Sequence, residues 1–139
     1  MELNFTVMGE PVAQGRPRFS SKARFTKPYD PAKSRKYKDY VRRVAQEYAP
    51  QEPLTGQLQV EIYVYKPSLK SFSKKKAEQA EQKILRPITK PDVDNYAKGI
   101  KDALNKIIWK DDSQVVDLRV QKFYSKNPRV EIRVKEIEI

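Results

Sequence analysis

Residues 90–116 read KPDVDNYAKGIKDALNKIIWKDDSQVV, and this stretch sets the expectation for the centre of the fold. Apolar residues recur along it with the spacing of one helix face: Ala97, Ile100, Leu104, Ile107 and Ile108. That spacing predicts an amphipathic helix over residues 95–108, ending at about Trp109, with its apolar face docked on a sheet.

The same stretch holds two tight pairs of aspartates, Asp92 with Asp94 and Asp111 with Asp112. An extended backbone before the helix would point Asp92 and Asp94 to the same side. A loop after the helix would bring an acid of the second pair beside them, so three carboxylates are expected to converge. On a helical wheel of about 100° per residue, the charged and polar side chains fall away from the apolar face: Asp94, Lys98, Lys101, Asp102 and Asn105.

Strands and helices are expected on both sides of this stretch. Helical spacing follows Asp30-Pro31, which supplies a cap and a first-turn proline, through Ala49, and a second helix is expected to start at residues 71–73. Residues 12–30 form a basic, aromatic loop without a regular period. Alternation of apolar and polar residues predicts strands over residues 2–8, about 58–65, 115–124 and 130–139. The order predicts a single domain, residues 1–139, of the α/β (α+β) class, with a mixed β-sheet packed with helices and a C-terminal β-hairpin.

Composition narrows the possible functions. The chain has 139 residues, with 29 Lys and Arg against 18 Asp and Glu and a formal charge of +11. This size suits one domain with one active site, and this charge favours nucleic acid as the partner. No apolar run is long enough to span a bilayer, and no signal peptide opens the sequence, so the expectation is a cytoplasmic protein with no membrane partner.

The absence of two residue types limits the chemistry. The sequence contains no His and no Cys, which excludes disulfides, thiolate zinc sites, a cysteine nucleophile and imidazole ligands or bases. Any catalysis must therefore use Asp, Glu, Lys, Tyr, Ser or a bound metal.

Clustered carboxylates in a basic chain oppose the charge that attracts a polyanion. A divalent cation removes this conflict, because oxygen ligands select Mg²⁺, with Mn²⁺ as a possible substitute, and the ion joins protein to phosphate. We therefore expect Asp92, Asp94 and Asp112 to be catalytic acids and metal ligands. Lys98, one turn after Asp94, is expected to act as a cation over the scissile phosphate or the leaving oxygen. Asp111 is the weaker candidate.

Structural roles explain part of the same pattern. Asp94 is a good helix cap, Asp92 would favour the helix dipole, and Asp111 with its neighbours is an ordinary turn composition. Lys98 and Asp102 also suit an ion pair on a solvated helix face. Two other functional classes stay open: a non-catalytic DNA- or RNA-binding domain, and a metal-dependent nuclease acting on flaps or single strands.

Three strings occur in a fixed order: KPDVDN at residues 90–95, DALN at residues 102–105 after Lys98, and DDSQV at residues 111–115. They are preceded by GEP at residues 9–11, GRPR at residues 15–18 and the basic SKKK at residues 73–76. Together these motifs cover most of the chain and resemble the RusA family of Holliday junction resolvases.

The resemblance implies a homodimeric, Mg²⁺-dependent endodeoxyribonuclease that makes paired, symmetric nicks in four-way DNA junctions during recombination and repair. Asp92, Asp94 and Asp112 match the family's catalytic acids, and Lys98 matches its essential lysine. Members are common in phages and prophages, so a bacterial, phage or prophage origin is expected.

Branched DNA as the partner also suggests an assembly and a set of contacts. A junction has approximate twofold symmetry, so one site per chain requires two chains to cut two strands. Phe19, Phe25 and Phe72 suit stacking on unpaired bases, although the same rings suit a core. The candidates for phosphate contacts, each of which also suits a merely solvated surface, are Arg16, Arg18, Lys74, Lys75 and Lys76.

Overall fold

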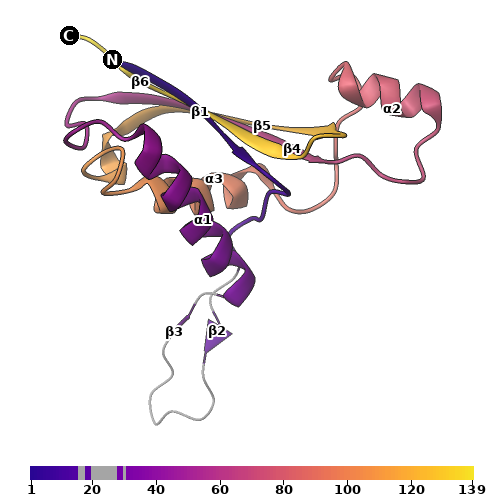
Figure 1. Ribbon diagram of the computed structural model, residues 1–139, viewed down its shortest axis with the longest axis horizontal. Coiled ribbons are helices and arrows are strands. Elements are labelled where there is room, and N and C mark those ends of the chain that lie inside the picture. The colour runs from indigo at the N-terminus through magenta and orange to yellow at the C-terminus, as the bar shows by residue number, and fades with distance from the viewer. Residues whose placement is uncertain (16–17, 20–27, 30) are drawn as a thin grey trace.

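The computed structural model describes residues 1–15, 18–19, 28–29 and 31–139; for residues 18, 19, 28 and 29 it describes the backbone only. Its main sheet has four strands in the order β1-β6-β4-β5 (Figure 1). β4 and β5 are parallel, and the other neighbours are antiparallel. The strands are β1 (Glu2–Met8), β4 (Leu58–Pro67), β5 (Val115–Ser125) and β6 (Arg129–Glu136).

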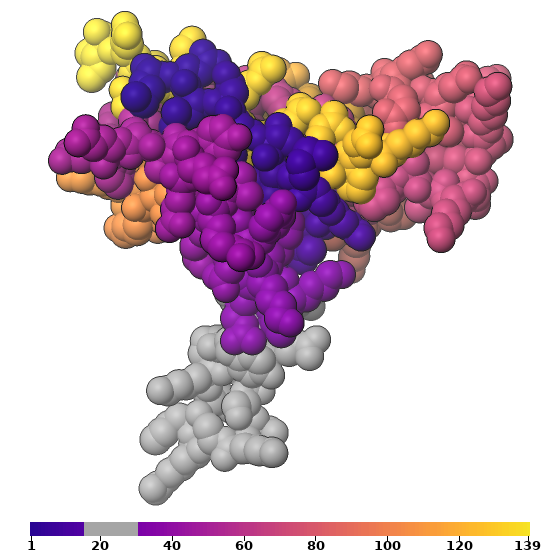
Figure 2. Space-filling model, in the orientation of Figure 1, coloured from indigo at the N-terminus to yellow at the C-terminus, as the bar shows by residue number. Residues whose placement is uncertain are grey.

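Three helices accompany the sheet, so the expected mixed α+β fold is confirmed. They are α1 (Ala32–Tyr48), α2 (Lys74–Glu81) and α3 (Val93–Leu104), with a short 3-10 turn η1 (Asp112–Gln114) before β5. Two short strands, β2 (Arg18–Phe19) and β3 (Pro28–Tyr29), pair with each other. α2 and its connections form a lobe beside the main body (Figure 2). None of the described helices combines the length and the apolar character that a bilayer span needs.

The core lies between the sheet and the two helices α1 and α3, which pack against each other on one side of it (Figure 1). Alternate residues of the strands face this core, as the period of two predicts. Phe5 and Val7 come from β1, and Ile62 and Ile132 come from the two central strands. On α3, the predicted apolar face is buried through Ala97, Ile100 and Leu104.

The two C-terminal strands follow one another and reverse direction at residues 126–128, as expected, but β4 lies between them. β4 pairs with β5 on one side and with β6 on the other. The terminal turn therefore spans the width of β4, and the hairpin is split by a central strand. Pairing partners of this kind depend on long-range contacts, which the apolar alternation of one strand does not encode.

The predicted helix over residues 95–108 is shorter than expected, because α3 ends at Leu104. Lys106 has a positive φ of 71°, and its N–H donates to the Trp109 carbonyl at 2.8 Å, which closes a turn. Ile108 and Trp109 are nevertheless fully buried. Ile108 and Trp109 reach the core from this turn. The apolar spacing in the sequence therefore continues past the end of the helix and resembles one more helical turn.

The other helix boundaries agree with the sequence to within a few residues. α1 starts after Pro31 and ends before Ala49, while Asp30 lies outside the described residues. α2 is capped by Ser73, whose Oγ accepts from the Lys76 N–H at 3.2 Å. It ends at Glu81, so Ile84 is not part of the helix and is exposed.

Candidate active site

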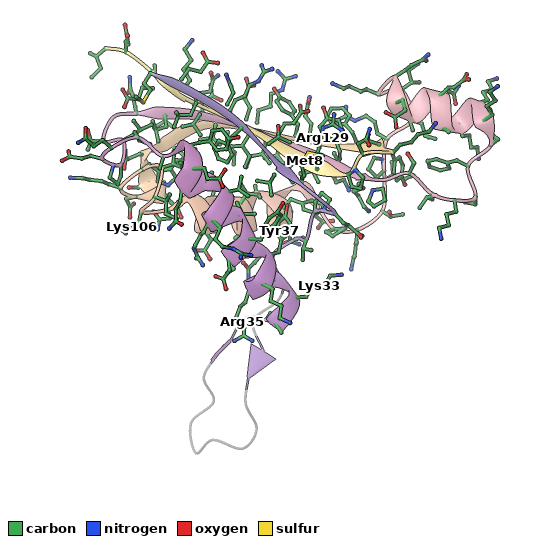
Figure 3. The ribbon with its side chains drawn as sticks, in the orientation of Figure 1. Met8, Lys33, Arg35, Tyr37, Lys106 and Arg129 are labelled. Carbon is green, nitrogen blue, oxygen red and sulfur yellow. The ribbon has the colours of Figure 1, made fainter. Side chains whose placement is uncertain are left out.

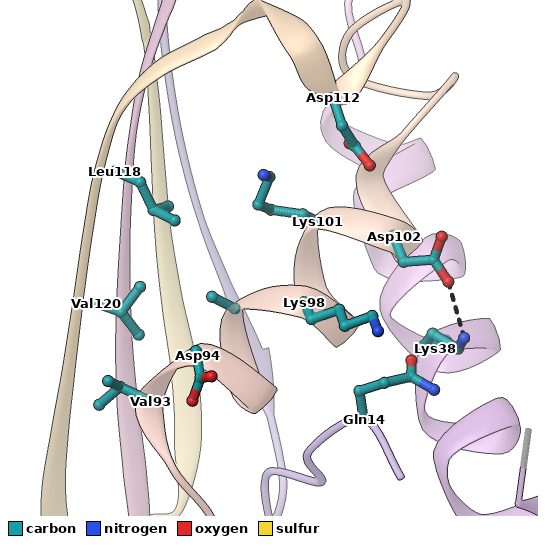
Figure 4. Close-up of a pocket in the computed structure, with 11 residues that line it drawn as sticks. Gln14, Lys38, Val93, Asp94, Lys98, Lys101, Asp102, Asp112, Leu118 and Val120 are labelled. Carbon is teal, nitrogen blue, oxygen red and sulfur yellow. Dashed lines mark hydrogen bonds and ion pairs between the residues drawn. The ribbon is translucent and has the colours of Figure 1, made fainter. Parts of the chain in front are cut away.

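A cleft of about 620 Å³, lined by three aspartates and three lysines among other residues, opens between α3, α1 and β5 (Figure 4). The N-terminal turns of α3 supply Asp94 and Lys98, and η1 supplies Asp112 from beyond the helix. In Figure 4, Asp94 and Asp112 stand apart, with the side chain of Lys101 between them in the view. The remaining lining residues are Gln14, Lys38, Val93, Ala97, Asp102, Leu118 and Val120. The structure thus brings three of the four predicted catalytic residues to one cleft.

Asp92 lies elsewhere, in a neighbouring hollow of about 640 Å³ whose lining includes Lys66, Lys90 and Gln14. Gln14 lines both the hollow and the cleft. The expectation that Asp92 and Asp94 point to the same side is therefore wrong. Asp92 is extended, with φ −72° and ψ 154°, but the helix begins at the next residue. Two helical steps rotate a side chain by about 200°, unlike two steps along a strand.

Neither acid of the first pair is used to cap the helix. Asp92 occupies the N-cap position, yet its side chain makes no capping hydrogen bond. Asp94 lies in the first turn of α3 and is exposed. The capping role expected of Asp94 is therefore wrong, whereas the position of Asp92 at the N-cap is compatible with the expected interaction with the helix dipole. Both carboxylates are exposed.

Two lysines of the sheet hold the segment that leads into Asp92. Lys122 Nζ donates to the carbonyls of Thr89 at 2.8 Å and Pro91 at 3.0 Å. Lys66 Nζ donates to the Lys90 carbonyl at 3.2 Å. Partial burial, and then the charge of Lys122, lower the pKa of Lys66. These contacts tie residues 89–91 to β4 and β5, so they fix the backbone immediately before the first acid.

The second pair divides into a structural acid and an available one. Asp111 caps η1: its carboxylate accepts from the Ser113 N–H at 2.9 Å and from the Ser113 hydroxyl, and its own N–H donates to Gln114 Oε1 at 2.8 Å. These bonds, first the one from the hydroxyl, lower the pKa of Asp111. Asp111 does not line the cleft, whereas Asp112 does. This geometry supports the choice of Asp112 over Asp111.

Trp109 orients Asp112 through a hydrogen bond. Its Nε1–H donates to Asp112 Oδ1 at 2.8 Å, and its ring is fully buried. Gln114 braces the same loop, because its Nε2 donates to the carbonyls of Leu54 at 2.8 Å and Gly56 at 2.9 Å. Asp112 therefore stands on a rigid support, with Oδ2 left without a hydrogen-bond partner among the residues described.

Lys38 is a further cleft residue that the sequence did not indicate. It is almost fully buried, and its Nζ contacts Asp102 Oδ2 at 2.8 Å (Figure 4). Asp102 was expected at most to pair with Lys98 on its own helix. The sequence did not indicate this ion pair because Lys38 and Asp102 are 64 residues apart. Lys38 also lies among other basic residues of α1, most of which are exposed.

The carboxylates fit a divalent cation in chemistry but not as a preformed cage. In the part of the chain that the structure describes, no three acidic side chains are arranged to hold a metal ion. The expected convergence of Asp92, Asp94 and Asp112 on one point is therefore not found. Hard oxygen donors nevertheless suit Mg²⁺, which commonly takes only one or two carboxylates and fills its shell with water and substrate phosphate. The residues present thus fit an ion that is completed by substrate.

The residues expected to contact DNA are only partly placed. Lys74, Lys75 and Lys76 form the exposed first turn of α2. Phe72 packs edge-on against Tyr124, with ring centroids 5.1 Å apart, as a packed aromatic residue does. The side chains of four further candidates are not described. Arg16 and Phe25 lie outside the described residues, and only the backbone of Arg18 and Phe19 is described.

Comparison with known proteins identifies the family of the chain. The family model for endodeoxyribonuclease RusA matches residues 8–135. The chain belongs to the RusA family. RusA-family proteins are endodeoxyribonucleases that resolve Holliday junctions, and the matched region contains Asp92, Asp94, Lys98 and Asp112. The chain is also 56% identical over 137 residues to the "Uncharacterized protein YqaN" of Bacillus subtilis (strain 168), covering 97% of this chain and 96% of that protein.

Proposed function

We propose that this protein is a Mg²⁺-dependent nuclease that resolves four-way DNA junctions by paired, symmetric nicks, and that it acts as a homodimer in DNA recombination and repair. One observation carries the proposal. Asp94 and Asp112, from two separate segments of a chain with a charge of +11, line one cleft together with Lys98 and Lys101. Family membership supports the reaction class.

The acids Asp92, Asp94 and Asp112 are our proposed ligands for the cation, with Mn²⁺ as a possible substitute. A bound Mg²⁺ would supply a water of lowered pKa and would stabilise charge on the phosphate. Carboxylates repel one another when no cation is bound, and the DNA phosphate is itself an oxygen ligand. The separation of the acids is therefore compatible with a site that is assembled by substrate.

The chain's own residues have distinct tasks in hydrolysis of the phosphodiester. The oxygen of water bonds to phosphorus, the bond from phosphorus to the leaving sugar oxygen breaks, and that oxygen takes up a proton. Lys98 projects from α3 into the cleft, where its ammonium group would offset negative charge on the phosphate or the leaving oxygen. Trp109 Nε1–H donates to Oδ1 of Asp112, which holds this acid of the cleft lining in place.

A dimer follows from the substrate. Two symmetry-related strands are to be cut, and among its described residues one chain offers one cleft that contains Asp94, Lys98 and Asp112. A closed twofold assembly of two copies would present two clefts to the two strands. It would also double the positive charge, so binding would weaken steeply with salt.

The proposal is tested with a panel of DNA shapes. With Mg²⁺, a synthetic four-way junction should be nicked in two symmetry-related strands, while linear duplex, a flap and a single strand should be largely spared. Equal cutting of junction and duplex would contradict the resolvase proposal and favour a nuclease of broader choice. Tight junction binding with no cleavage in Mg²⁺ or Mn²⁺ would favour a non-catalytic DNA-binding protein.

A further inference from the structure

The sheet has a second face that no described helix covers, and we call it the open face (Figure 1). Its residues alternate with the core residues along each strand. Arg129 lies on this side of the sheet, whereas Tyr37 and Lys33 belong to α1 on the helix side (Figure 3). A groove of about 400 Å³ on the open face is lined by Tyr63, Tyr65, Lys83, Arg86, Arg119, Gln121, Phe123, Glu131 and Arg133.

Two stacked rings form the floor of this groove. Tyr65 and Phe123, from neighbouring parallel strands, lie with centroids 5.2 Å apart at an angle of 25°. Their outer faces are already taken by cations. The Arg129 guanidinium lies 3.8 Å from the Tyr65 centroid, and the Arg86 guanidinium lies 4.4 Å from that of Phe123. Because Tyr65 and Phe123 are buried and covered, neither offers a free face on which a nucleic acid base could stack, and Tyr63 is the one partly exposed ring among the described groove residues.

The charges in the groove do not cancel. Glu131 already accepts from Arg129 Nε at 2.9 Å and from the Tyr65 hydroxyl at 3.3 Å. Lys83, Arg86 and Arg119 make no ion pair with any acid of the described residues. Nε of Arg86 donates to the Lys122 carbonyl at 2.9 Å, which holds that guanidinium in place. Arg133, by contrast, contacts Glu61 at 3.9 Å. The groove thus carries an excess of positive charge, with the Arg86 guanidinium held in place, and suits an anionic partner.

The groove is connected to the cleft through β5, which is an edge strand. Leu118 and Val120 of β5 line the cleft, while Arg119 and Gln121 between and after them line the groove. A DNA arm that leaves the cleft across this edge would meet Arg119 first. Arg86 lies in the segment that leads to Asp92, so both ends of the groove adjoin elements that carry site residues.

We propose that the open-face groove binds the phosphate backbone of one duplex arm of the branched substrate, outside the cleft. The proposal rests on the proposed function. Guanidinium groups match phosphate oxygens in geometry and charge, and such contacts position a duplex without reading its sequence. The covered rings favour duplex backbone over single-stranded DNA, which is generally held by stacking of its bases.

The test compares two double variants that each remove two exposed positive charges. Arg119→Gln with Arg133→Gln neutralises the groove, and both residues are exposed. Arg43→Gln with Lys36→Gln is the matched control: both residues are exposed, both belong to α1 on the helix side of the sheet, and neither lines the groove. Junction affinity is measured without divalent metal over a range of salt concentrations, on arms of about 30 base pairs and on arms of about 10, one helical turn. Melting temperatures check that both variants fold.

On long arms, the groove variant should lower the slope of log affinity against log salt by about 0.9 for each phosphate that it no longer neutralises. Arms of about 10 base pairs already extend past Arg119, which adjoins the cleft residues Leu118 and Val120, so a fall in slope is expected on them too. The control should match the wild type on both lengths. An unchanged slope on both lengths, or weaker binding confined to single-stranded DNA, would each overturn the proposal.

Nicking rates at saturating protein separate this proposal from the proposed function. The groove variant should cut bound junctions at the wild-type rate. If the wild type cuts no junction but the groove variant still has a lower salt slope on long arms, the surface stands and the nuclease proposal fails. If the wild type cuts junctions and the groove variant binds them like the control, only the groove proposal fails.

Discussion

Replacing Asp112 with Asn, beside the matched change Asp111→Asn, should separate the catalytic acid from the structural one. The two residues are adjacent and both variants lose one negative charge, so general effects of charge on DNA binding are the same. Their contacts differ. Asp112 faces the cleft and accepts from Trp109, whereas Asp111 caps η1 and does not line the cleft.

Asp112→Asn should fold almost normally. The amide Oδ1 can still accept from Trp109 Nε1, a bond of 2.8 Å in the structure. Exchanging a charged acceptor for a neutral one weakens such a bond by roughly 1 kcal/mol. Cleavage should fall by roughly a hundredfold or more, the scale for removing one preorganised charge contact from a transition state. A hundredfold corresponds to about 2.7 kcal/mol of activation free energy.

The assay is single-turnover cleavage of a synthetic four-way junction in Mg²⁺, with junction binding measured separately in the absence of metal. Asp111→Asn should cut within a few-fold of the wild type, while Asp112→Asn should bind the junction and barely cut it. A reversed order, with Asp111→Asn inactive and Asp112→Asn active, would refute the assignment. Equal loss of cleavage in both variants would mean that the loop acts as a unit and that the cleft geometry does not distinguish the two acids.

Three further predictions follow from the same contacts. Lys122→Met removes the two hydrogen bonds to the backbone of residues 89–91. It should slow junction cleavage on the order of tenfold, because Asp92 is misplaced, and leave metal-free binding unchanged. Cleavage at the wild-type rate would count against this anchoring role. Replacing the three exposed lysines of α2 with Ala should lower the salt slope of junction binding by about 0.9 for each lysine that contacts phosphate, whereas an unchanged slope would remove α2 from the interface. The hydrogen bonds from Ser113 hold the pKa of Asp111 below its usual 3.8. The carboxylate therefore contributes stability above pH about 4, and this contribution is lost as the pH falls through the folded-state pKa. Urea unfolding should show Asp111→Asn less stable than the wild type at pH 7, with the difference in free energy of unfolding closing in acid; a difference independent of pH would contradict this.

Local patterns predicted most of the elements and three of the residues that line the cleft, Asp94, Lys98 and Asp112. The strand alternation in residues 2–8 predicted β1 with its observed limits, and the wheel of α3 placed Asp94 and Lys98 away from the core. These features depend on neighbours in sequence, because backbone geometry fixes which residues share a face. The family motifs selected the same residues.

Long-range contacts account for what the sequence did not predict. β4 enters between β5 and β6, and Lys38 reaches Asp102 across 64 residues. The true end of α3 depends on the turn at Lys106 and on pairing of the Trp109 segment with Leu54. Asp92 and Asp94 were expected on one side because the backbone was taken as extended, whereas the helix begins between them. None of these contacts leaves a short-range pattern in the amino-acid order.

The central claim is that carboxylates lining the cleft make this basic chain a metal-dependent nuclease. The most direct measurement is the cutting of a four-way junction by wild type and by Asp94→Asn, each with Mg²⁺ and with EDTA, beside metal-free binding of the same junction. The account predicts two symmetric nicks from the wild type in Mg²⁺ only, and near-normal binding with almost no nicking from the variant. Full nicking by Asp94→Asn, or nicking by the wild type in EDTA, would contradict it.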